Sequence, residues 1–275
     1  MHQPNDVEFA TTHLATGVTL HYAERGGPTE ETIVFLHGYS DSWFSFSRVL
    51  PLLSPEYHAF ALTQRGHGDS DKPECCYTPG DFAADVDAFM DAVGVEEATL
   101  VGASTGALFA QRVALSYPRR VSRLVLIAPQ TPVHEELSGL VEEMRALEDP
   151  VPPEFVSGFQ ESTIYHPVPQ EFLDTAVSES LKLPARVWRD YLDQAVLSID
   201  HDYVVELREI EAPTLILRGE QDALFPREED ERLAAAISDA TLKIYPETGH
   251  AVHWERPEEV VRDLEAFIKD TSPAR

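Results

Sequence analysis

The chain has 275 residues, of which 43% are hydrophobic and 9% aromatic, so it can bury a large core and is not a disordered segment. Its 48 acidic and 21 basic residues give a formal charge of −27, and such a surface repels nucleic-acid phosphates and anionic membrane headgroups. Only four basic residues are lysines, a composition that fits either a saline cytoplasm or the ordinary acidic proteome of a GC-rich genome.

The ends of the chain and its cysteines indicate a cytoplasmic protein. The first residues have neither the basic nor the apolar region of a signal peptide, and no apolar run approaches the roughly 18 residues of a membrane span. Cys75 and Cys76 are neighbours. A disulfide between neighbours is strained, so we expect no structural bridge, and two cysteines are too few for a zinc cage.

Eight short runs rich in β-forming residues predict strands, and helical spacing between several of them predicts helices. The first two runs flank a turn at Gly17 and predict a hairpin. Later runs are continuously apolar, as strands buried on both faces are, and their alternation with helical patterns predicts a mostly parallel sheet. The runs are 7–13, 18–24, 32–36, 58–63, 98–101, 123–128, 214–217 and 241–245, and helical spacing covers 82–93 and 108–115.

The alternation stops between residues 130 and 211. This stretch is rich in proline and has amphipathic helical patterns at 137–147 and 187–197. An insertion of this length between two parallel strands lies over the edge where such sheets bind ligands. The sequence therefore predicts a core domain, 1–129 with 212–275, and a helical lid, 130–211.

The sharpest local motif is Gly102-Ala103-Ser104-Thr105-Gly106, which follows a predicted strand and opens a helix. A nucleophile held in a tight strand-to-helix turn needs small neighbours, and this motif provides them. The alternative is an ordinary helix start capped by Ser104.

A serine hydroxyl needs a base, and the base needs an orienting carboxylate. Asp222 and His250 each follow a late predicted strand, so both are expected at the edge where Ser104 lies. Glu220 competes for the role of the acid, but Asp222 lies beyond the turn at Gly219 and has the shorter side chain. Taken singly, Asp222 could be a turn residue and His250 a solvated loop histidine.

The first buried strand ends in His37-Gly38-Tyr39. Acyl transfer needs backbone N–H donors directed at the developing oxyanion, and the amides of Tyr39 and Thr105 would lie on either side of Ser104. The alternative is a plain turn with His37 packed as a structural residue.

Together these motifs resemble the α/β-hydrolase superfamily over nearly the whole chain. The resemblance rests on His37-Gly38-Tyr39, Arg65-Gly66-His67-Gly68-Asp69-Ser70, Gly102 to Gly106, Gly219-Glu220-Gln221-Asp222 and 249–257. It implies a mostly parallel eight-stranded sheet flanked by helices, with 130–211 as a helical cap. Two positions depart from the usual pattern: Ala103 replaces a frequent His, which opens the pocket floor, and Thr63 replaces a frequent Asp, which concerns loop packing.

The resemblance also implies the site: Ser104 as nucleophile, His250 as base, Asp222 as its acid, and the amides of Tyr39 and Thr105 as oxyanion donors. The predicted function is a serine hydrolase of a small, largely apolar carboxylic ester or lactone. It needs no cofactor and no metal, and acts as a monomer or homodimer without nucleic-acid or membrane partners. Ser104 disfavours dehalogenases and epoxide hydrolases, which use an aspartate nucleophile.

Three alternatives stay open: a carbon–carbon bond hydrolase, a cofactor-free perhydrolase, and a non-enzymatic ligand-binding signalling module. Among the remaining residues, we expect His253 and Trp254 to pack a helix start and His67 to hydrogen-bond within its loop. The aromatic residues of the insertion should form its core, with one or two facing the pocket, and Trp188 or Tyr191 should affect chain-length preference. The aromatic residues singled out for this expectation are Phe155, Phe159, Tyr165, Trp188 and Tyr191.

Overall fold

The computed structural model describes residues 7–29, 31–133, 137–199 and 203–273. Its centre is one eight-stranded sheet with the strand order β1-β2-β4-β3-β5-β6-β7-β8. All eight predicted strands are present, with ends that differ from the sequence prediction by at most three residues. They are β1 Val7–His13, β2 Thr19–Arg25, β3 Glu31–Leu36, β4 Tyr57–Thr63, β5 Ala98–Ala103, β6 Val121–Ile127, β7 Thr214–Gly219 and β8 Ala240–Tyr245.

Strand direction brings the predicted site residues to one edge of the sheet. β2 is antiparallel to β1 and β4, whereas every pair from β4 to β8 is parallel. In the register of the central strands, Ala103 lies opposite Ile127, and Ile127 lies opposite Leu217. The segments that follow β5, β7 and β8 therefore leave the sheet at the same, carboxyl edge.

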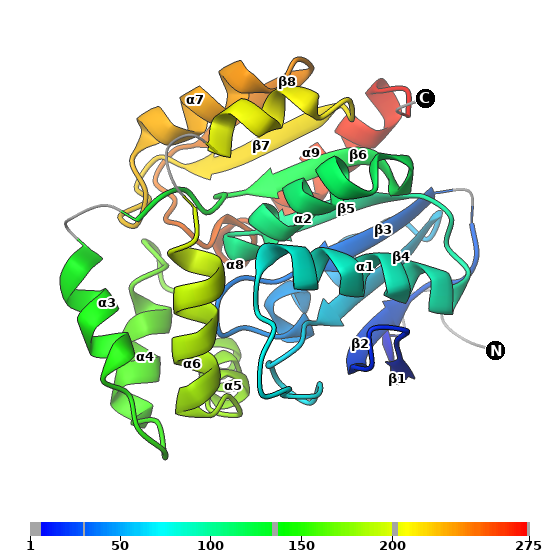
Figure 1. Ribbon diagram of the computed structural model, residues 1–275. Coiled ribbons are helices and arrows are strands. Elements are labelled where there is room, and N and C mark those ends of the chain that lie inside the picture. The colour runs from blue at the N-terminus through cyan, green and yellow to red at the C-terminus, as the bar shows by residue number, and fades with distance from the viewer. Residues whose placement is uncertain (1–6, 30, 134–136, 200–202, 274–275) are drawn as a thin grey trace.

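Helices cover both faces of this sheet (Figure 1). In that view α1 and α2 lie in front and α9 lies behind. Successive side chains of β3 point to opposite faces of the sheet, so they belong to two separate hydrophobic cores. Val34 and Leu36 pack in the core on the side of α1 and α2, and Ile33 and Phe35 pack in the core on the side of α9. The helices outside the segment between β6 and β7 are α1 Pro79–Val93, α2 Thr105–Ser116, α7 Arg227–Ala236, α8 Val252–Glu255 and α9 Pro257–Asp270. The short 3-10 helices are η1 Trp43–Phe46, η2 Leu50–Leu52, η3 Pro118–Arg120 and η6 Tyr203–Glu209.

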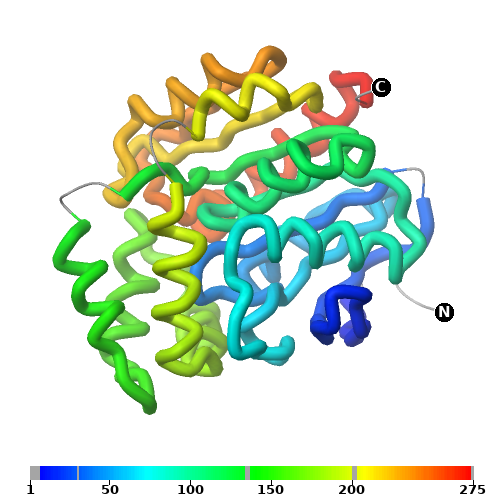
Figure 2. The backbone as a smooth tube through the Cα atoms, viewed as in Figure 1, coloured from blue at the N-terminus to red at the C-terminus, as the bar shows by residue number. Residues whose placement is uncertain are grey.

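The segment between β6 and β7 forms a group of helices at the carboxyl edge of the sheet (Figure 2). We call them the inserted helices: α3 Ser138–Arg145, α4 Pro153–Glu161, α5 Gln170–Ser180, α6 Ala185–Tyr191 and the π-helix η5 Leu192–Val196. The amphipathic patterns at 137–147 and 187–197 correspond to α3 and to α6 with η5. Helices α4 and α5 were not predicted, and each begins directly after a proline.

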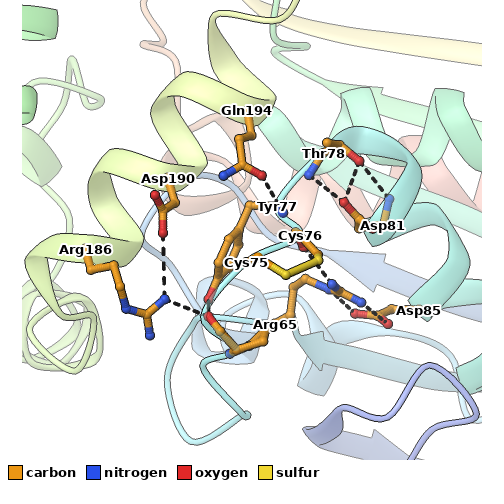
Figure 3. The surroundings of a disulfide bond; sticks show 11 residues. Arg65, Cys75, Cys76, Tyr77, Thr78, Asp81, Asp85, Arg186, Asp190 and Gln194 are labelled. Atoms are coloured by element: carbon orange, nitrogen blue, oxygen red, sulfur yellow. Dashed lines mark hydrogen bonds and ion pairs between the residues drawn. A yellow bond between two sulfur atoms is a disulfide. The ribbon is translucent and has the colours of Figure 1, made fainter.

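The prediction for the cysteines was wrong, because a disulfide joins Cys75 and Cys76 (Figure 3). The backbone of Cys76 has a φ of +75°, in the left-handed region, and this turn brings the two neighbouring side chains together. Around them, Arg65 donates to the Cys76 carbonyl at 2.6 Å, and the Tyr77 amide donates to Gln194 of the inserted helices at 3.0 Å. Within the described ranges, no helix combines the length and apolar character needed to cross a bilayer.

Candidate active site

Ser104 lies in a strained turn between β5 and α2. Its backbone has φ +53° and ψ −119°, a conformation that side-chain-bearing residues rarely adopt. The turn is held by the Ser104 amide, which donates to the Ile127 carbonyl at 2.9 Å, and by the Ser104 carbonyl, which accepts from the Ala107 amide at 3.0 Å. This is the strand-to-helix elbow that the motif predicts, and it raises the Ser104 side chain above the edge of the sheet.

The two glycines of the motif are required by close backbone packing. A Cβ on Gly102 would collide with the Gly106 carbonyl, and a Cβ on Gly106 would collide with the carbonyls of Leu36 and His37. Ala107 packs against Gly102 in the same way. Helix α2 therefore starts so close to β3 and β5 that no residue larger than glycine fits at positions 102 and 106.

His250 and Asp222 are brought together by the loops after β8 and β7. Nδ1 of His250 lies 2.8 Å from Oδ2 of Asp222, and the Asp222 side chain is only 1% exposed. Its other oxygen, Oδ1, accepts from the amides of Leu224 at 2.8 Å and Phe225 at 3.3 Å. An ionised Asp222 accepts from Nδ1–H, which leaves Nε2 of His250 free to take up a proton. Glu220, the competing acid, is exposed.

A buried cation supports this acid. Arg218 lies 4.0 Å from Asp222, forms an ion pair with Asp230 and donates to the Phe225 carbonyl at 2.8 Å. Burial raises the pKa of Asp222. The charge and hydrogen bond of His250, the Leu224 amide and Arg218 outweigh that effect and leave the pKa below its usual value. Asp222 is therefore ionised at neutral pH. Sequence reasoning missed Arg218, because nothing in its spacing marks it as a partner of Asp222.

Ser104 and His250 line one pocket, which we call the histidine lobe. In the part of the chain that the structure describes, no hydrogen bond joins the Ser104 hydroxyl to the His250 ring; such bonds are commonly long without substrate and tighten when it binds. The lobe is lined by Gly38, Tyr39, Asp41, Ala103, Ser104, Ile127, Phe159, Gln160, Thr163, Leu224, His250, Ala251, His253 and Trp254. The small Ala103 belongs to this lining.

A second pocket meets the first at Ser104 and extends under the inserted helices; we call it the apolar lobe. Its lining is almost entirely hydrophobic: Tyr39, Ser104, Gln130, Val133, Leu137, Leu140, Val141, Met144, Phe159, Leu192, Val196, Leu224 and Phe225. Four residues, Tyr39, Ser104, Phe159 and Leu224, line both lobes. The nucleophile candidate therefore lies where the histidine lobe and the apolar lobe meet.

Tyr39 and Thr105, the expected oxyanion donors, flank Ser104. Thr105 is the first residue of α2, so its amide has no acceptor within the helix. Tyr39 follows Gly38, where an added Cβ would lie 3.1 Å from the Ser104 Cβ. The hydroxyls of these residues are engaged elsewhere, since Tyr39 donates to the Trp188 carbonyl and Thr105 accepts from Tyr191 at 2.6 Å. The backbone amides are the groups available for an oxyanion.

The other histidines singled out in the sequence are buried and hydrogen-bonded. Nε2 of His37 accepts from the Gln64 amide at 3.0 Å, so Nδ1 donates to the Gly38 carbonyl at 2.8 Å. His67 contacts the Arg65 carbonyl at 2.8 Å, as a loop hydrogen-bonder should. His253 is packed at a helix start, as expected, but it also lines the histidine lobe, as Trp254 does. Burial and the nearby His250 lower the pKa of His253 to about 3, so its ring is neutral.

As the sequence suggested, some aromatic residues of the insertion are buried in its core and others line the pocket. The residues that line the pocket are not the two that were expected to affect chain length. Trp188 and Tyr191 are fully buried in the core and line neither lobe. Phe159 of α4 lines both lobes. Tyr165 is 52% exposed, and Phe155 packs edge-on against Trp188 with ring centroids 5.4 Å apart.

Two further residues of the histidine lobe were not predicted. Asp41 follows the His37-Gly38-Tyr39 motif, and its carboxylate Oδ1 accepts from Nε2 of Gln160 at 3.0 Å. Gln160 also donates to Ser180 of α5 at 2.8 Å, so it connects the β3–η1 loop with the inserted helices. Within the described ranges, no group of three or more His, Cys, Asp or Glu side chains is arranged to hold a metal ion.

Comparison with known proteins agrees with this architecture. A family model for the alpha/beta hydrolase fold matches residues 31–257. A relative from Pseudomonas putida is named 2-hydroxy-6-oxononadienedioate/2-hydroxy-6-oxononatrienedioate hydrolase 2. It is 30% identical over 272 residues, and the alignment covers 91% of this chain and 91% of the relative. The chain belongs to the alpha/beta hydrolase family.

Solved structures of other proteins share the fold closely. A bacterial membrane phospholipase A superposes with a TM-score of 0.83 and 26% identity, covering 96% of this chain and 86% of that one. An esterase from Exiguobacterium antarcticum superposes with a TM-score of 0.81 over 94% of this chain and 98% of that one; at 22% identity, this likeness shows the fold alone. The names of these proteins all describe hydrolases, but of different substrates. Family membership therefore supports a hydrolase without specifying the bond that it cleaves.

Proposed function

We propose that the protein is a serine hydrolase that cleaves a small, largely apolar carboxylic ester or lactone through an acyl-enzyme on Ser104. The observation that carries this proposal is the meeting of two lobes at Ser104, with His250 lining the histidine lobe and held by its buried partner Asp222. A nucleophile, a base and an oriented acid at one pocket are the groups that acyl transfer needs.

The reaction follows from the positions of these groups. Nε2 of His250 takes the proton of the Ser104 hydroxyl while Oγ attacks the substrate carbonyl, and Asp222 stabilises the imidazolium that forms. The amides of Tyr39 and Thr105 hold the negative oxygen of the tetrahedral intermediate. His250 then gives its proton to the leaving alcohol oxygen. In the second half, His250 activates a water that attacks the acyl-enzyme and releases the acid, returning the proton to Ser104.

The two lobes have different roles in this reaction. The leaving oxygen must be within reach of His250, so the alcohol part occupies the histidine lobe. The acyl part then extends to the other side of Ser104, into the apolar lobe, where each buried methylene contributes about 0.8 kcal/mol. We also propose that residues 130–211 act as a cap, because the inserted helices provide Leu140, Val141 and Met144 of that lining.

A second candidate is a carbon–carbon bond hydrolase with the same three residues. It is favoured by relatives named as hydrolases of 2-hydroxy-6-oxononadienedioate, an oxo-dicarboxylate without an ester bond. The charge of the pocket argues against this substrate: among the described lining residues neither lobe has a lysine or arginine, and the histidine lobe has the acidic Asp41. A dicarboxylate would lose its hydration there without gaining a cationic partner.

Purified enzyme and Ser104→Ala, each tested with p-nitrophenyl butyrate and with 2-hydroxy-6-oxononadienedioate, separate these functions. Steady release of nitrophenol by the wild type, absent in Ser104→Ala, supports the esterase. Turnover of the dicarboxylate without ester turnover supports the second candidate. A single stoichiometric burst with no further turnover contradicts both and indicates a ligand-binding module.

A further inference from the structure

Asp41 is a carboxylate in the histidine lobe for which the proposed reaction has no use. Asp41 is partly buried. Among the described residues that line either lobe, and leaving the histidines aside, no other side chain is charged at neutral pH. Its Oδ1 accepts from Gln160, and its Oδ2 accepts from the Ser45 hydroxyl at 3.0 Å. These two bonds leave lone pairs on both oxygens for a further donor.

The hydrogen bonds around Ser45 favour the ionised form of Asp41. The Ser45 oxygen lies 2.9 Å from Nε1 of Trp254, which can only donate, and 2.9 Å from Nε2 of His253. When Ser45 accepts from both rings, its own hydroxyl hydrogen points at Asp41. Burial raises the pKa of Asp41 to about 6, while Gln160, Ser45 and the nearby His250 act in the opposite direction. At pH 8 the carboxyl is therefore ionised.

Asp41 and Ser104 lie on the same side of Gly38. A Cβ built on Gly38 would be 3.1 Å from the Ser104 Cβ and 3.5 Å from Oδ2 of Asp41. The missing side chain thus leaves open the space between nucleophile and carboxylate. Gly38, Asp41 and His250 line the same lobe, so a leaving group held there is within reach of Asp41.

The rest of the histidine lobe suits a cation. Tyr39, Phe159 and Trp254 are among its lining residues, and aromatic rings attract ammonium groups by about 0.5–2 kcal/mol. The formal charge of −27 on the whole chain raises the local concentration of cations near the surface. The aromatic rings and the negative charge of the chain would both disfavour an anionic leaving group.

We propose that the histidine lobe selects esters whose leaving alcohol carries an ammonium group, with Asp41 as the residue that determines this specificity. The proposal rests on the proposed esterase function. It assigns the apolar part of the substrate to the acyl side and the charge to the alcohol side.

The test compares two butyrate esters of almost equal shape, butyrylcholine and 3,3-dimethylbutyl butyrate, on wild type, Asp41→Asn and Asp239→Asn. Asp239 is exposed at the amino end of β8, on the edge of the sheet opposite Ser104, so its variant removes the same charge far from the lobe. Because an ammonium group also changes intrinsic ester reactivity, the readout is the change, between variants, in the ratio of the two kcat/KM values.

We expect Asp41→Asn to lower this ratio by about tenfold, the size of one partly buried charge contact, chiefly through KM for butyrylcholine. Asp239→Asn should keep the wild-type ratio. An unchanged ratio in Asp41→Asn overturns the proposal, since a merely structural Asp41 would lower both esters alike. If the wild type hydrolyses neither these esters nor p-nitrophenyl butyrate, the proposed function itself fails.

The pH dependence gives a second readout. The titratable groups around Asp41 are His250, His253, Tyr39 and Tyr191. Burial keeps the last three neutral near pH 7, because it lowers the pKa of His253 and raises the pKa of both tyrosines. Both esters need His250 as the same base, so the contribution of this residue cancels in the ratio. Between pH 8 and pH 5 the wild-type ratio should therefore fall as Asp41 is protonated, whereas the Asp41→Asn ratio should stay constant. A wild-type ratio independent of pH contradicts the assignment.

Discussion

Asp222 contacts His250 through one carboxylate oxygen and two backbone amides through the other, so the whole side chain is fixed. Oδ2 lies 2.8 Å from Nδ1 of His250, and Oδ1 accepts from the amides of Leu224 and Phe225. Rotation of the carboxylate would break all three hydrogen bonds. Asp222 can therefore hold one tautomer of His250, whereas the exposed Glu220 two residues earlier cannot.

The first prediction compares these two carboxylates. Asp222→Asn should lower ester turnover by about 10³- to 10⁴-fold, because an amide can donate to His250 and favours the wrong tautomer. Glu220→Gln should change turnover by less than about tenfold, since an exposed loop carboxylate contributes little. Steady-state rates on p-nitrophenyl butyrate measure both. The reverse ranking would make Glu220 the acid.

The second prediction concerns the nucleophile. Ser104→Ala should lower ester turnover by a factor on the order of 10⁴ or more while the thermal melt stays close to that of the wild type. The fold should tolerate the change because the contacts that hold the turn are made by the backbone of residue 104. A variant that retains a tenth of wild-type activity would rule out Ser104 as the nucleophile.

The strands and the site motifs could be predicted because their signals are local. A strand buried on both faces is a short apolar run, and each motif lies within a few residues of a strand end. The inserted helices were harder to predict. Helices α4 and α5 lie among the prolines between 150 and 184, which are typical of turns and hide the helical spacing between them.

Asp41, Gln160 and Phe159 could not be predicted because their roles depend on contacts between distant segments. Asp41 and Gln160 are 119 positions apart and meet only when α4 lies over the β3–η1 loop. Phe159 is one of seven aromatic residues of the insertion, and only the packing of α4 separates it from the buried Trp188. The disulfide was missed because its formation depends on the left-handed backbone of Cys76.

The third prediction concerns acyl chain length. Phe159→Ala should extend the apolar lobe and raise kcat/KM for octanoate relative to butyrate by about fivefold, since longer chains bury additional methylenes. Phe155→Ala is the matched control, because Phe155 lies on the same helix and packs on Trp188 without lining either lobe. A series of p-nitrophenyl esters measures the profile, and equal profiles in the two variants would show that Phe159 does not limit the acyl group.

The fourth prediction concerns salt. With 48 acidic and 21 basic residues, the folded chain carries strong internal repulsion. Molar potassium chloride shortens the screening length to about 3 Å, so the melting temperature should rise between low and molar salt. Calorimetric melts at several salt concentrations measure this. A flat or falling melting temperature would show that carboxylate repulsion does not limit stability.

The last prediction concerns the effect of Asp41 on stability. Burial raises its pKa from 3.8 to about 6, with Gln160 and Ser45 opposing the rise. Since the folded pKa lies above the unfolded one, the folded chain keeps a proton that the unfolded chain has already released. The stabilisation from that proton is complete below about pH 4 and is lost as the pH rises through about 6.

Asp41→Asn has no such proton, so the difference in unfolding free energy between wild type and variant should change in this window alone. Urea unfolding at a series of pH values measures that difference, in which titrating groups distant from Asp41 cancel because the two proteins share them. We expect wild type to lose stability relative to Asp41→Asn from pH 4 to pH 6 and the difference to be constant above pH 7. With the exposed Asp239→Asn as the control, the same plot should be flat. A wild type that gains stability over Asp41→Asn as the pH rises would mean that the folded pKa of Asp41 is lowered. In that case its hydrogen bonds to Gln160 and Ser45 would outweigh its burial.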